Sequence, residues 1–401
     1  MELQRLENLR RTYRDGLLRD VLPFWIDHGV DRDQGGFFTC LDRDGSVIDT
    51  DKSVWAQGRF SWLLGELYNT VDHSDQWLDL AEHGIEFLEK FGFDRSGDGR
   101  MFFHLARDGQ PVRKRRYNFS ESFAAIAYGE FAQATGSDEF RTKAIELFES
   151  FVTYNFTSGV IPPKCTDLRP MKGLAVRIVT IASAQELRSS VGYERANDWI
   201  DRAIDEIRRL FVKLEQRVVM ESVGPNGEIF DHFDGRLLNP GHAMEGAWFI
   251  LDEAKRRRES DLKELGLTML DSMWQRGWDS EYGGLFYFRD LKNLPSQEYW
   301  HDMKFWWPQN EAIIATLMAY QLTGDKKYAD WHELVHDWTY SHFPDPDFGE
   351  WFGYLHRDGT LSVPLKGNVW KGPFHIPRMQ LVCWRLVEEM LEGRKSQTNE
   401  S

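Results

Sequence analysis

"GGFFTCLDRDG" at residues 35–45 has counterparts along the whole chain, and their spacing decides the fold. A glycine followed by apolar or aromatic residues returns in "DGRMFFHLARDG" (98–109), "SGVIPP" (158–163), "NGEIFDHFDG" (226–235), "GGLFYFRD" (283–290) and "GEWFGYLHRDG" (349–359). The interval is about 60 residues, and such a period indicates a repeated supersecondary unit. The Arg-Asp-Gly endings are suited to tight turns between short extended runs.

Two kinds of helical segment fill each period. Segments such as "SESFAAIAYGEFAQATG" are apolar nearly all round, which is typical of helices buried on both sides. The intervening segments, such as "DQWLDLAEHGIEFLEKFG", have one apolar stripe and one polar face. Six of each, alternating, predict an all-α fold, an (α/α)6 barrel with short β-hairpins in the loops at the active-site end. An open solenoid is the alternative, but it would bring no six helix starts to one centre. We expect residues 1–392 to form this single domain and residues 393–401 a polar C-terminal tail.

Composition excludes several classes of protein. The 401 residues carry a net charge of −15, which disfavours nucleic acid and anionic membranes as partners. There is no apolar run long enough to span a bilayer and no apolar signal core, so we expect a cytoplasmic protein. Three cysteines without a CxxC pair are expected to be free thiols. No HExxH, GxxxxGK[ST] or GxGxxG is present, so neither a metal nor a nucleotide loop is predicted.

Charged residues recur near the starts of the apolar segments with the period of the repeat. They are Arg59, Glu121, Arg177, the pair His242 and Glu245, Glu311, and the pair His375 and Arg378. Any one of them alone is explained as a helix cap or a surface ion pair. Buried charges must pair or line a water-accessible cavity, so their coincidence in six units predicts a central pocket. Aromatic walls would suit a sugar there. The residues expected to form them are Trp55, Tyr117, Trp248, Trp306 and Trp307.

The two histidines share one local layout. In "NPGHAMEGAW" (239–248) and "KGPFHIPR" (371–378), Gly and Pro precede a His that is followed three residues later by a charged residue. Residues at i and i+3 share a helix face, so His242 should project with Glu245, and His375 with Arg378. The histidines lie two repeats apart and should approach a central ligand from different sides. Two bases flanking one carbon are what epimerisation by proton transfer requires, and histidine titrates near neutral pH. The arginines and Lys304 would stabilise an enolate oxygen.

At these residues the sequence resembles the N-acylglucosamine 2-epimerase family, sugar epimerases and isomerases built on an (α/α)6 barrel. The resemblance spans nearly the whole chain. It is carried by "KSVWAQGR" (52–59), "RYNFSESF" (116–123), "NPGHAMEGAW" (239–248), "KFWWPQNEA" (304–312) and "WKGPFHIPR" (370–378).

The resemblance implies roles for individual residues. His242 and His375 would be the acid–base pair at C2 of an open-chain sugar, with Arg59 near the C1 oxygen. Glu245 and Glu311 would orient the histidines or substrate hydroxyls. The candidates for sugar binding are Trp55, Tyr117, Asn118, Glu121, Arg177, Lys304, Trp307 and Arg378.

Within the family, "PGHAMEGAW" followed by "WWPQNEA" is most similar to the N-acylglucosamine branch. The resemblance therefore implies interconversion of N-acyl-D-glucosamine and N-acyl-D-mannosamine, in a homodimer that needs no cofactor. It also implies ATP as an allosteric activator that is not consumed. Relatives acting on cellobiose or mannose carry an extra His in the third inner helix, where this chain has Arg177 and no His.

Three other functions remain open at this point. An aldose–ketose isomerase, or a 2-epimerase of mannose or cellobiose, would use the same barrel. A glycoside hydrolase would need two carboxylates, which Glu121, Glu245 and Glu311 could supply. A non-catalytic binding barrel is the last alternative. The two His-centred helix starts favour the epimerase.

Overall fold

The computed structural model describes residues 1–114, 118–162 and 164–399, and its helices form two rings. The inner ring consists of α3 (Val54–Thr70), α5 (Phe119–Thr135), α7 (Leu174–Ser190), α10 (Pro240–Arg257), α12 (Trp306–Thr323) and α14 (His375–Asn399). The outer helices that follow the first five of these are α4 (Asp75–Phe91), α6 (Asp138–Phe156), α8 (Ala196–Glu206), α11 (Ser260–Gly277) and α13 (Lys326–His342). The alternation of apolar and amphipathic segments is therefore the alternation of inner and outer helices.

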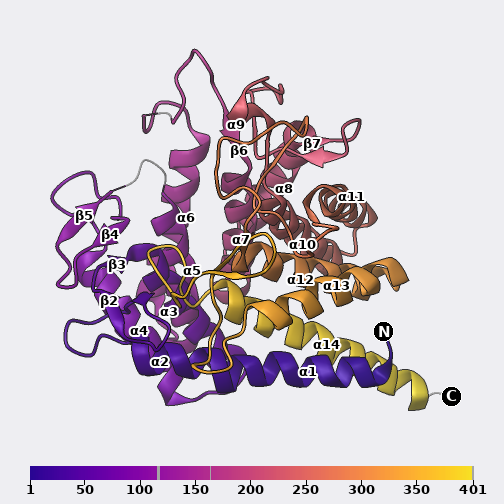
Figure 1. The fold of residues 1–401 in the computed structure, drawn as a ribbon. Helices are drawn as coiled ribbons and strands as arrows, with labels where there is room; N and C mark the ends of the chain where they lie inside the picture. Colours follow the sequence, from indigo (N-terminus) through magenta and orange to yellow (C-terminus); the bar gives the residue numbers. More distant parts are fainter. Residues whose placement is uncertain (115–117, 163, 400–401) are drawn as a thin grey trace.

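The N-terminal segment supplies the sixth outer helix. α1 (Leu3–Gly16), a π-helical turn η1 (Leu17–Val21) and α2 (Leu22–Gly29) form this segment, and α1 packs against α14. Figure 1 shows α1 and α14 side by side, with the two chain ends near each other. The inner ring closes between the last and first units, where Arg385 on α14 donates to Glu66 on α3 over 2.6 Å. Closure excludes the open solenoid and confirms the predicted barrel.

Short antiparallel strands connect the units at the N-terminal ends of the inner helices. Three-stranded sheets are formed by β3 (Lys52–Ser53), β4 (His104–Leu105) and β5 (Pro111–Arg113), and by β12 (Lys304–Phe305), β13 (Tyr354–Leu355) and β14 (Leu361–Val363). The two-stranded pairs are β1 (Cys40–Leu41) with β2 (Val47–Asp49), β6 (Lys172–Gly173) with β9 (Ser222–Val223), β7 (Val212–Lys213) with β8 (Val218–Val219), and β10 (Leu237–Leu238) with β11 (Arg289–Asp290). A second π-helical turn, η2 (Ile207–Phe211), extends α8, and a short helix α9 (Phe233–Arg236) precedes β10. The predicted hairpins are thus present.

The six repeat glycines all have left-handed backbone conformations. Their φ angles lie between 70° and 91°, at Gly36, Gly99, Gly159, Gly227, Gly284 and Gly349. Glycine adopts this region without the steric cost that a Cβ brings. At Gly284 a Cβ would also lie 2.7 Å from the ring of Trp338. Five of these glycines mark the turn that follows an outer helix, and Gly227 lies in the loop between β9 and α9.

The Arg-Asp-Gly motif has a structural role beyond its turn. In three units the arginine reaches back to a buried aspartate of the preceding unit, and a buried lysine joins the same carboxylate. The triads are Asp31 with Lys52 and Arg107, Asp279 with Lys304 and Arg357, and Asp345 with Lys366 and Arg43, with N···O distances of 2.8 to 3.0 Å. Hydrogen bonds from the cations outweigh burial and hold the pKa of each aspartate below its ordinary value. Because Arg43 belongs to the first unit and Asp345 to the last, this triad also closes the ring.

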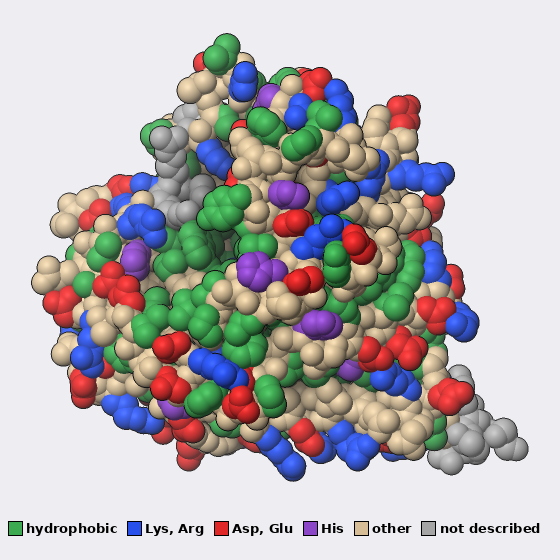
Figure 2. Space-filling view, in the orientation of Figure 1, with side chains coloured by type: hydrophobic (Ala, Val, Ile, Leu, Met, Phe, Trp, Pro, Cys, Tyr) green, Lys and Arg blue, Asp and Glu red, His purple; other side chains and the backbone are tan. Residues whose placement is uncertain are grey.

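None of the described helices is long and apolar enough to cross a membrane. α14 continues to Asn399, so the stretch expected as a polar tail begins as helix, and Arg394 donates to the backbone oxygen of Met1. On the face drawn in Figure 2, hydrophobic side chains gather near the middle and charges of both signs are interspersed around them.

Candidate active site

The N-terminal halves of the inner helices surround a cavity of about 1540 Å³ on the barrel axis. Ten of the residues predicted from the sequence line it. They are Trp55, Arg59, Arg177, His242, Glu245, Trp248, Trp306, Trp307, His375 and Arg378. Residues from five inner helices, far apart in the sequence, therefore meet around one space, as the repeat predicts.

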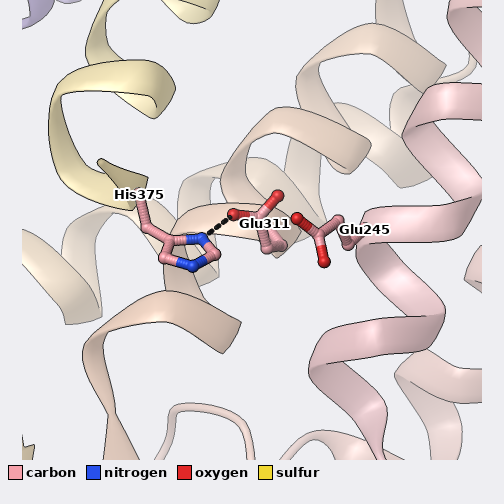
Figure 3. A group of neighbouring side chains, drawn as sticks. All are labelled: Glu245, Glu311 and His375. Carbon is pink, nitrogen blue, oxygen red and sulfur yellow. Dashed lines mark hydrogen bonds and ion pairs between the residues drawn. The ribbon is translucent and has the colours of Figure 1, made fainter. Parts of the chain in front are cut away.

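His375 stands at the start of α14, whose first turn tolerates Pro377 because the N–H that proline lacks would be unpaired there. Its Nδ1 lies 2.7 Å from Oε1 of Glu311, a fully buried carboxylate on α12. Figure 3 shows this contact, with Glu245 of α10 on the other side of Glu311. A carboxylate at Nδ1 fixes the tautomer that protonates this nitrogen, which leaves Nε2 free to accept a proton.

Glu311 is shared among three donors. Besides the imidazole, Nη2 of Arg378 donates to Oε1 over 2.7 Å, and the indole of Trp248 donates to Oε2 over 2.7 Å. Its charge is therefore already balanced by Arg378. Burial, followed by the Arg378 and Arg59 guanidinium groups, holds the pKa of His375 well below its ordinary value. His375 is a neutral base at neutral pH.

His242 has a different partner. It follows Pro240 in the first turn of α10, and the Asn239 side chain caps this turn by accepting from the His242 backbone N–H. Nδ1 of His242 lies 2.9 Å from Oε2 of Glu221, which precedes β9. Burial lowers the pKa of His242, but the charge and hydrogen bond of Glu221 outweigh it and raise the pKa above its ordinary value. The sequence reasoning missed Glu221 and assigned this type of role to Glu245.

The two imidazoles face a common space. Both contact Trp307, with ring centroids 5.1 Å from it for His242 and 5.7 Å for His375. The charge of His242 is also among the groups that lower the pKa of His375. The pKa values of the two rings are thus shifted in opposite directions.

Glu245 binds Arg378 rather than a histidine. Nη2 of Arg378 donates to its Oε1 over 2.6 Å, so one guanidinium bridges Glu245 and Glu311. Ligand atoms of Glu245, Glu311 and His375 lie within 4.8 Å of one another, a spacing at which three such groups can hold a metal ion. Here the cation between the carboxylates is the arginine itself.

Arg59 lines the cavity and has no carboxylate partner among the described residues. Its guanidinium lies 4.0 Å from the ring centroid of Phe123 and 4.5 Å from that of Phe374. Burial, and then the charge of Arg378, lowers the pKa of Arg59 to about 9, so it stays protonated at neutral pH. A protonated group with free donors beside two imidazoles is suited to stabilise an oxyanion.

Other predicted site residues take different positions. Lys304 does not reach the cavity, because it is fully buried in the triad with Asp279. Burial lowers its pKa to about 8, and Asp279 opposes that effect. Arg177 does lie at the wall, where it pairs with Glu206 on α8 at 2.6 Å. Glu311 lies one layer behind the wall.

Glu121 is also part of the scaffold. Its Oε1 accepts from the backbone N–H of Met101 over 2.7 Å, as Gln57 accepts from Phe37 and Gln309 from Leu285. Burial raises the pKa of Glu121 to about 7. Asn118 is buried, donates to Glu121 and does not line the cavity. The prediction for Tyr117 lies outside the described residues.

A closed (α/α)6 barrel that gathers two carboxylate-held imidazoles and an unpaired guanidinium around one cavity defines an acid–base enzyme for a small polar substrate. Residues 36–376 match the N-acylglucosamine 2-epimerase (GlcNAc 2-epimerase) family. The chain is 36% identical to N-acylglucosamine 2-epimerase of Bos taurus, over 98% of this chain and 94% of that protein. It is 37% identical to N-acylglucosamine 2-epimerase of Homo sapiens, over 92% and 87%. The chain belongs to this family of epimerases.

Solved structures agree with the fold. The structure of cellobiose 2-epimerase from Bacillus thermoamylovorans superposes with a TM-score of 0.82 at 20% identity, covering 96% of this chain and 100% of that one. The predicted family and barrel are therefore confirmed.

Proposed function

We propose that this isomerase interconverts N-acyl-D-glucosamine and N-acyl-D-mannosamine by moving a proton at C2 of the open-chain sugar. The observation that carries the proposal is the pair of imidazoles, His242 and His375, each with Nδ1 on a carboxylate and both against Trp307. The substrate pair follows from the curated relatives, which are N-acylglucosamine 2-epimerases at 34 to 37% identity.

The chemistry follows from the two protonation states. Nε2 of neutral His375 takes the proton from C2, and the electron pair moves through the C1–C2 bond onto the C1 oxygen. Arg59 donates to the enediolate oxygen as its charge develops. The imidazolium of His242 then returns a proton to C2 from the opposite face, and the carbonyl forms again. One forward turnover leaves His375 protonated and His242 neutral, which are the states that the reverse reaction uses. Proton exchange with solvent restores the starting states for another forward turnover.

A glycoside hydrolase fits this site less well. It needs one carboxyl group as a proton donor and a second free as base or nucleophile. Glu245 and Glu311 both accept from Arg378, and Glu121 accepts from a backbone N–H in the scaffold. No pair of these three carboxyl groups is free to flank a glycosidic bond, whereas both imidazoles have a free nitrogen.

The test is incubation with N-acetyl-D-mannosamine in deuterated water, followed by proton NMR of the sugar. We expect N-acetyl-D-glucosamine to appear with deuterium at C2. A ketose product from mannose, with no reaction of N-acetyl-D-mannosamine, would replace the epimerase by an aldose–ketose isomerase. Release of a reducing sugar from an oligosaccharide would replace it by a hydrolase.

The remaining expectations are part of the same proposal. The residues described for the reaction supply proton transfer and charge stabilisation without a cofactor, and the family resemblance supports ATP as an activator that is not consumed. The same resemblance supports a homodimer in the cytoplasm. Running the assay with and without ATP tests the activation by ATP. Measuring the mass of the particle in solution by light scattering tests the homodimer.

A further inference from the structure

The cavity continues below the two histidines, and its walls change character with depth. Each inner helix contributes a side chain to the axis at every turn, because positions three or four apart share a face. On α3 these are Trp55, Arg59, Trp62 and Glu66, and on α14 they are His375, Arg378, Val382 and Arg385, all lining the same space. The helices thus stack four layers of side chains along the axis.

The first two layers hold the chemistry described above. Trp55, Trp307 and the histidines form the first layer, and Arg59, Glu245 and Arg378 the second. The reacting carbon must lie in the first layer, between the imidazoles.

The third layer is an apolar chamber. Its lining side chains come from five inner helices and carry no charge. They are Trp62, Ile126, Ala182, Phe249, Leu381 and Val382. From Arg59 to Glu66 the helix advances about 10 Å, at 1.5 Å per residue, so the chamber has depth as well as width.

The fourth layer is an acidic floor. Carboxylate oxygens of Glu66, Glu130 and Glu186 lie within 4.8 Å of one another. Burial, and then the charge of Glu66, raises the pKa of Glu186 to about 8. Asp252 and Glu389 line the floor as well, while Arg385 is paired with Glu66. A negative group reaching this depth would meet other carboxylates and no unpaired cation among the described residues.

We propose that the apolar chamber binds the acyl chain of the N-acyl hexosamine, and that the enzyme prefers acyl groups longer than acetyl. This inference rests on the proposed function. The acylamido group is bonded to C2, between the imidazoles, so a group directed down the axis passes the second layer, where Nε of Arg59 is buried without a hydrogen-bond partner among the described residues. Only the apolar chamber lies beyond. The cavity of about 1540 Å³ includes this chamber as well as the outer entrance, so the chamber is continuous with the space between the histidines.

The experiment compares kcat/KM for N-acetyl-, N-butanoyl- and N-hexanoyl-D-mannosamine. Burial of a methylene is worth about 0.8 kcal/mol, so we expect kcat/KM to rise by up to about fourfold for each added methylene. N-succinyl-D-mannosamine should lose this gain, because its terminal carboxylate would leave water for the apolar chamber, where no unpaired cation among the described residues can bind it.

The second part of the experiment uses a variant in which a larger side chain fills the apolar chamber. Ala182→Leu places a larger side chain in the third layer, and we expect the ratio of kcat/KM for hexanoyl to acetyl substrates to fall at least tenfold. The matched control is Ser189→Leu, on an exposed turn of the same helix, which should leave the ratio unchanged.

The outcomes separate this proposal from the proposed function. Epimerisation of N-acetyl-D-mannosamine with no gain for longer chains, or an equal effect of Ala182→Leu on all substrates, overturns the chamber and keeps the epimerase. If no N-acyl sugar reacts, saturation-transfer NMR measures binding directly. Tighter binding of the longer chains would then uphold the chamber, and absence of binding would overturn both.

Discussion

The two imidazole–carboxylate pairs of this barrel have the same local geometry and opposite chemistry. In both, a carboxylate holds Nδ1 of a histidine in the first turn of an inner helix. Glu221 serves His242 with its full charge and raises the pKa of that ring. Glu311 shares its charge with Arg378, so burial dominates and lowers the pKa of His375. The difference teaches that the third partner of the carboxylate, rather than the carboxylate itself, decides in which direction the pKa of the ring is shifted.

Removing either imidazole should have the largest effect on the reaction, because only one of the two imidazole–carboxylate pairs then remains. His242→Asn and His375→Asn should each lower the rate of epimerisation by about 10²–10⁴, the usual range for a lost acid–base group. The remaining ring can still exchange the C2 proton on its own face. Each variant should therefore incorporate deuterium into one epimer only, and the two variants into opposite epimers, as followed by NMR. Exchange of the same epimer by both variants would contradict the two-base assignment.

Glu311→Gln should produce the next largest effect. The amide cannot accept from His375, Arg378 and Trp248 with a full charge, and loss of a buried charged partner costs about 2–5 kcal/mol. We expect kcat to fall about a hundredfold, measured with saturating substrate. Trp248→Phe removes one of the three bonds and should cost about tenfold. An equal loss in both variants would mean that the indole, and not the charge, holds His375.

Glu221→Gln should change the pH profile more than the maximal rate. Glu221 raises the pKa of His242, so its neutralisation lowers that pKa. The direction that needs protonated His242 loses activity as the pH rises through this pKa. Its alkaline limb should therefore move to lower pH in a plot of kcat/KM against pH. An unmoved limb would exclude His242 as the acid in that direction.

Lys304→Met should leave both imidazole–carboxylate pairs, and therefore kcat, unchanged. Lys304 lies in the ion triad of the scaffold, and breaking a buried pair typically costs about 3–5 kcal/mol of stability. We expect a lower midpoint in urea unfolding and an unchanged kcat. Lys366→Met, in the equivalent triad, is the matched control and should behave alike. A loss of kcat confined to the Lys304 variant would return this lysine to the active site.

The features predicted well from sequence are those that a local period encodes. The helix alternation follows from apolar patterning, and the six glycines mark turns that their φ angles confirm. His242 and His375 were found because Gly and Pro fix their place in a first helical turn. Such signals need no knowledge of distant contacts.

Glu121 and Lys304 were predicted to line the cavity but lie in the scaffold, and helix geometry explains the error for Glu121. Gln57 and Arg59 are two residues apart, or about 200° around a helix, so one points to a hairpin and the other to the axis. Glu121 follows the pattern of Gln57, although its spacing along the chain resembles that of Arg59. Lys304 has the same role in its triad as Lys52 and Lys366 have in theirs, and no local sequence pattern marks these lysines as partners of a buried aspartate.

Glu221 could not be found in the same way. It lies in a connection between strands, 21 residues before its histidine, and no repeat period marks it. Its role depends on how β9 pairs with β6, a contact of residues about 50 apart. Long-range pairing of this kind leaves no local pattern.

The contact of Arg43 with Asp345 joins residues separated by 302 positions, and the helix that completes the ring also carries His375 and Arg378. Loop-closure entropy makes so distant a contact slow to form. A nascent chain can therefore assemble five hairpins, with Arg59, Glu245 and Glu311 in place, and still lack its base. Activity should therefore appear only after the ring has closed. During refolding, recovery of turnover should lag behind recovery of the circular dichroism signal of the helices.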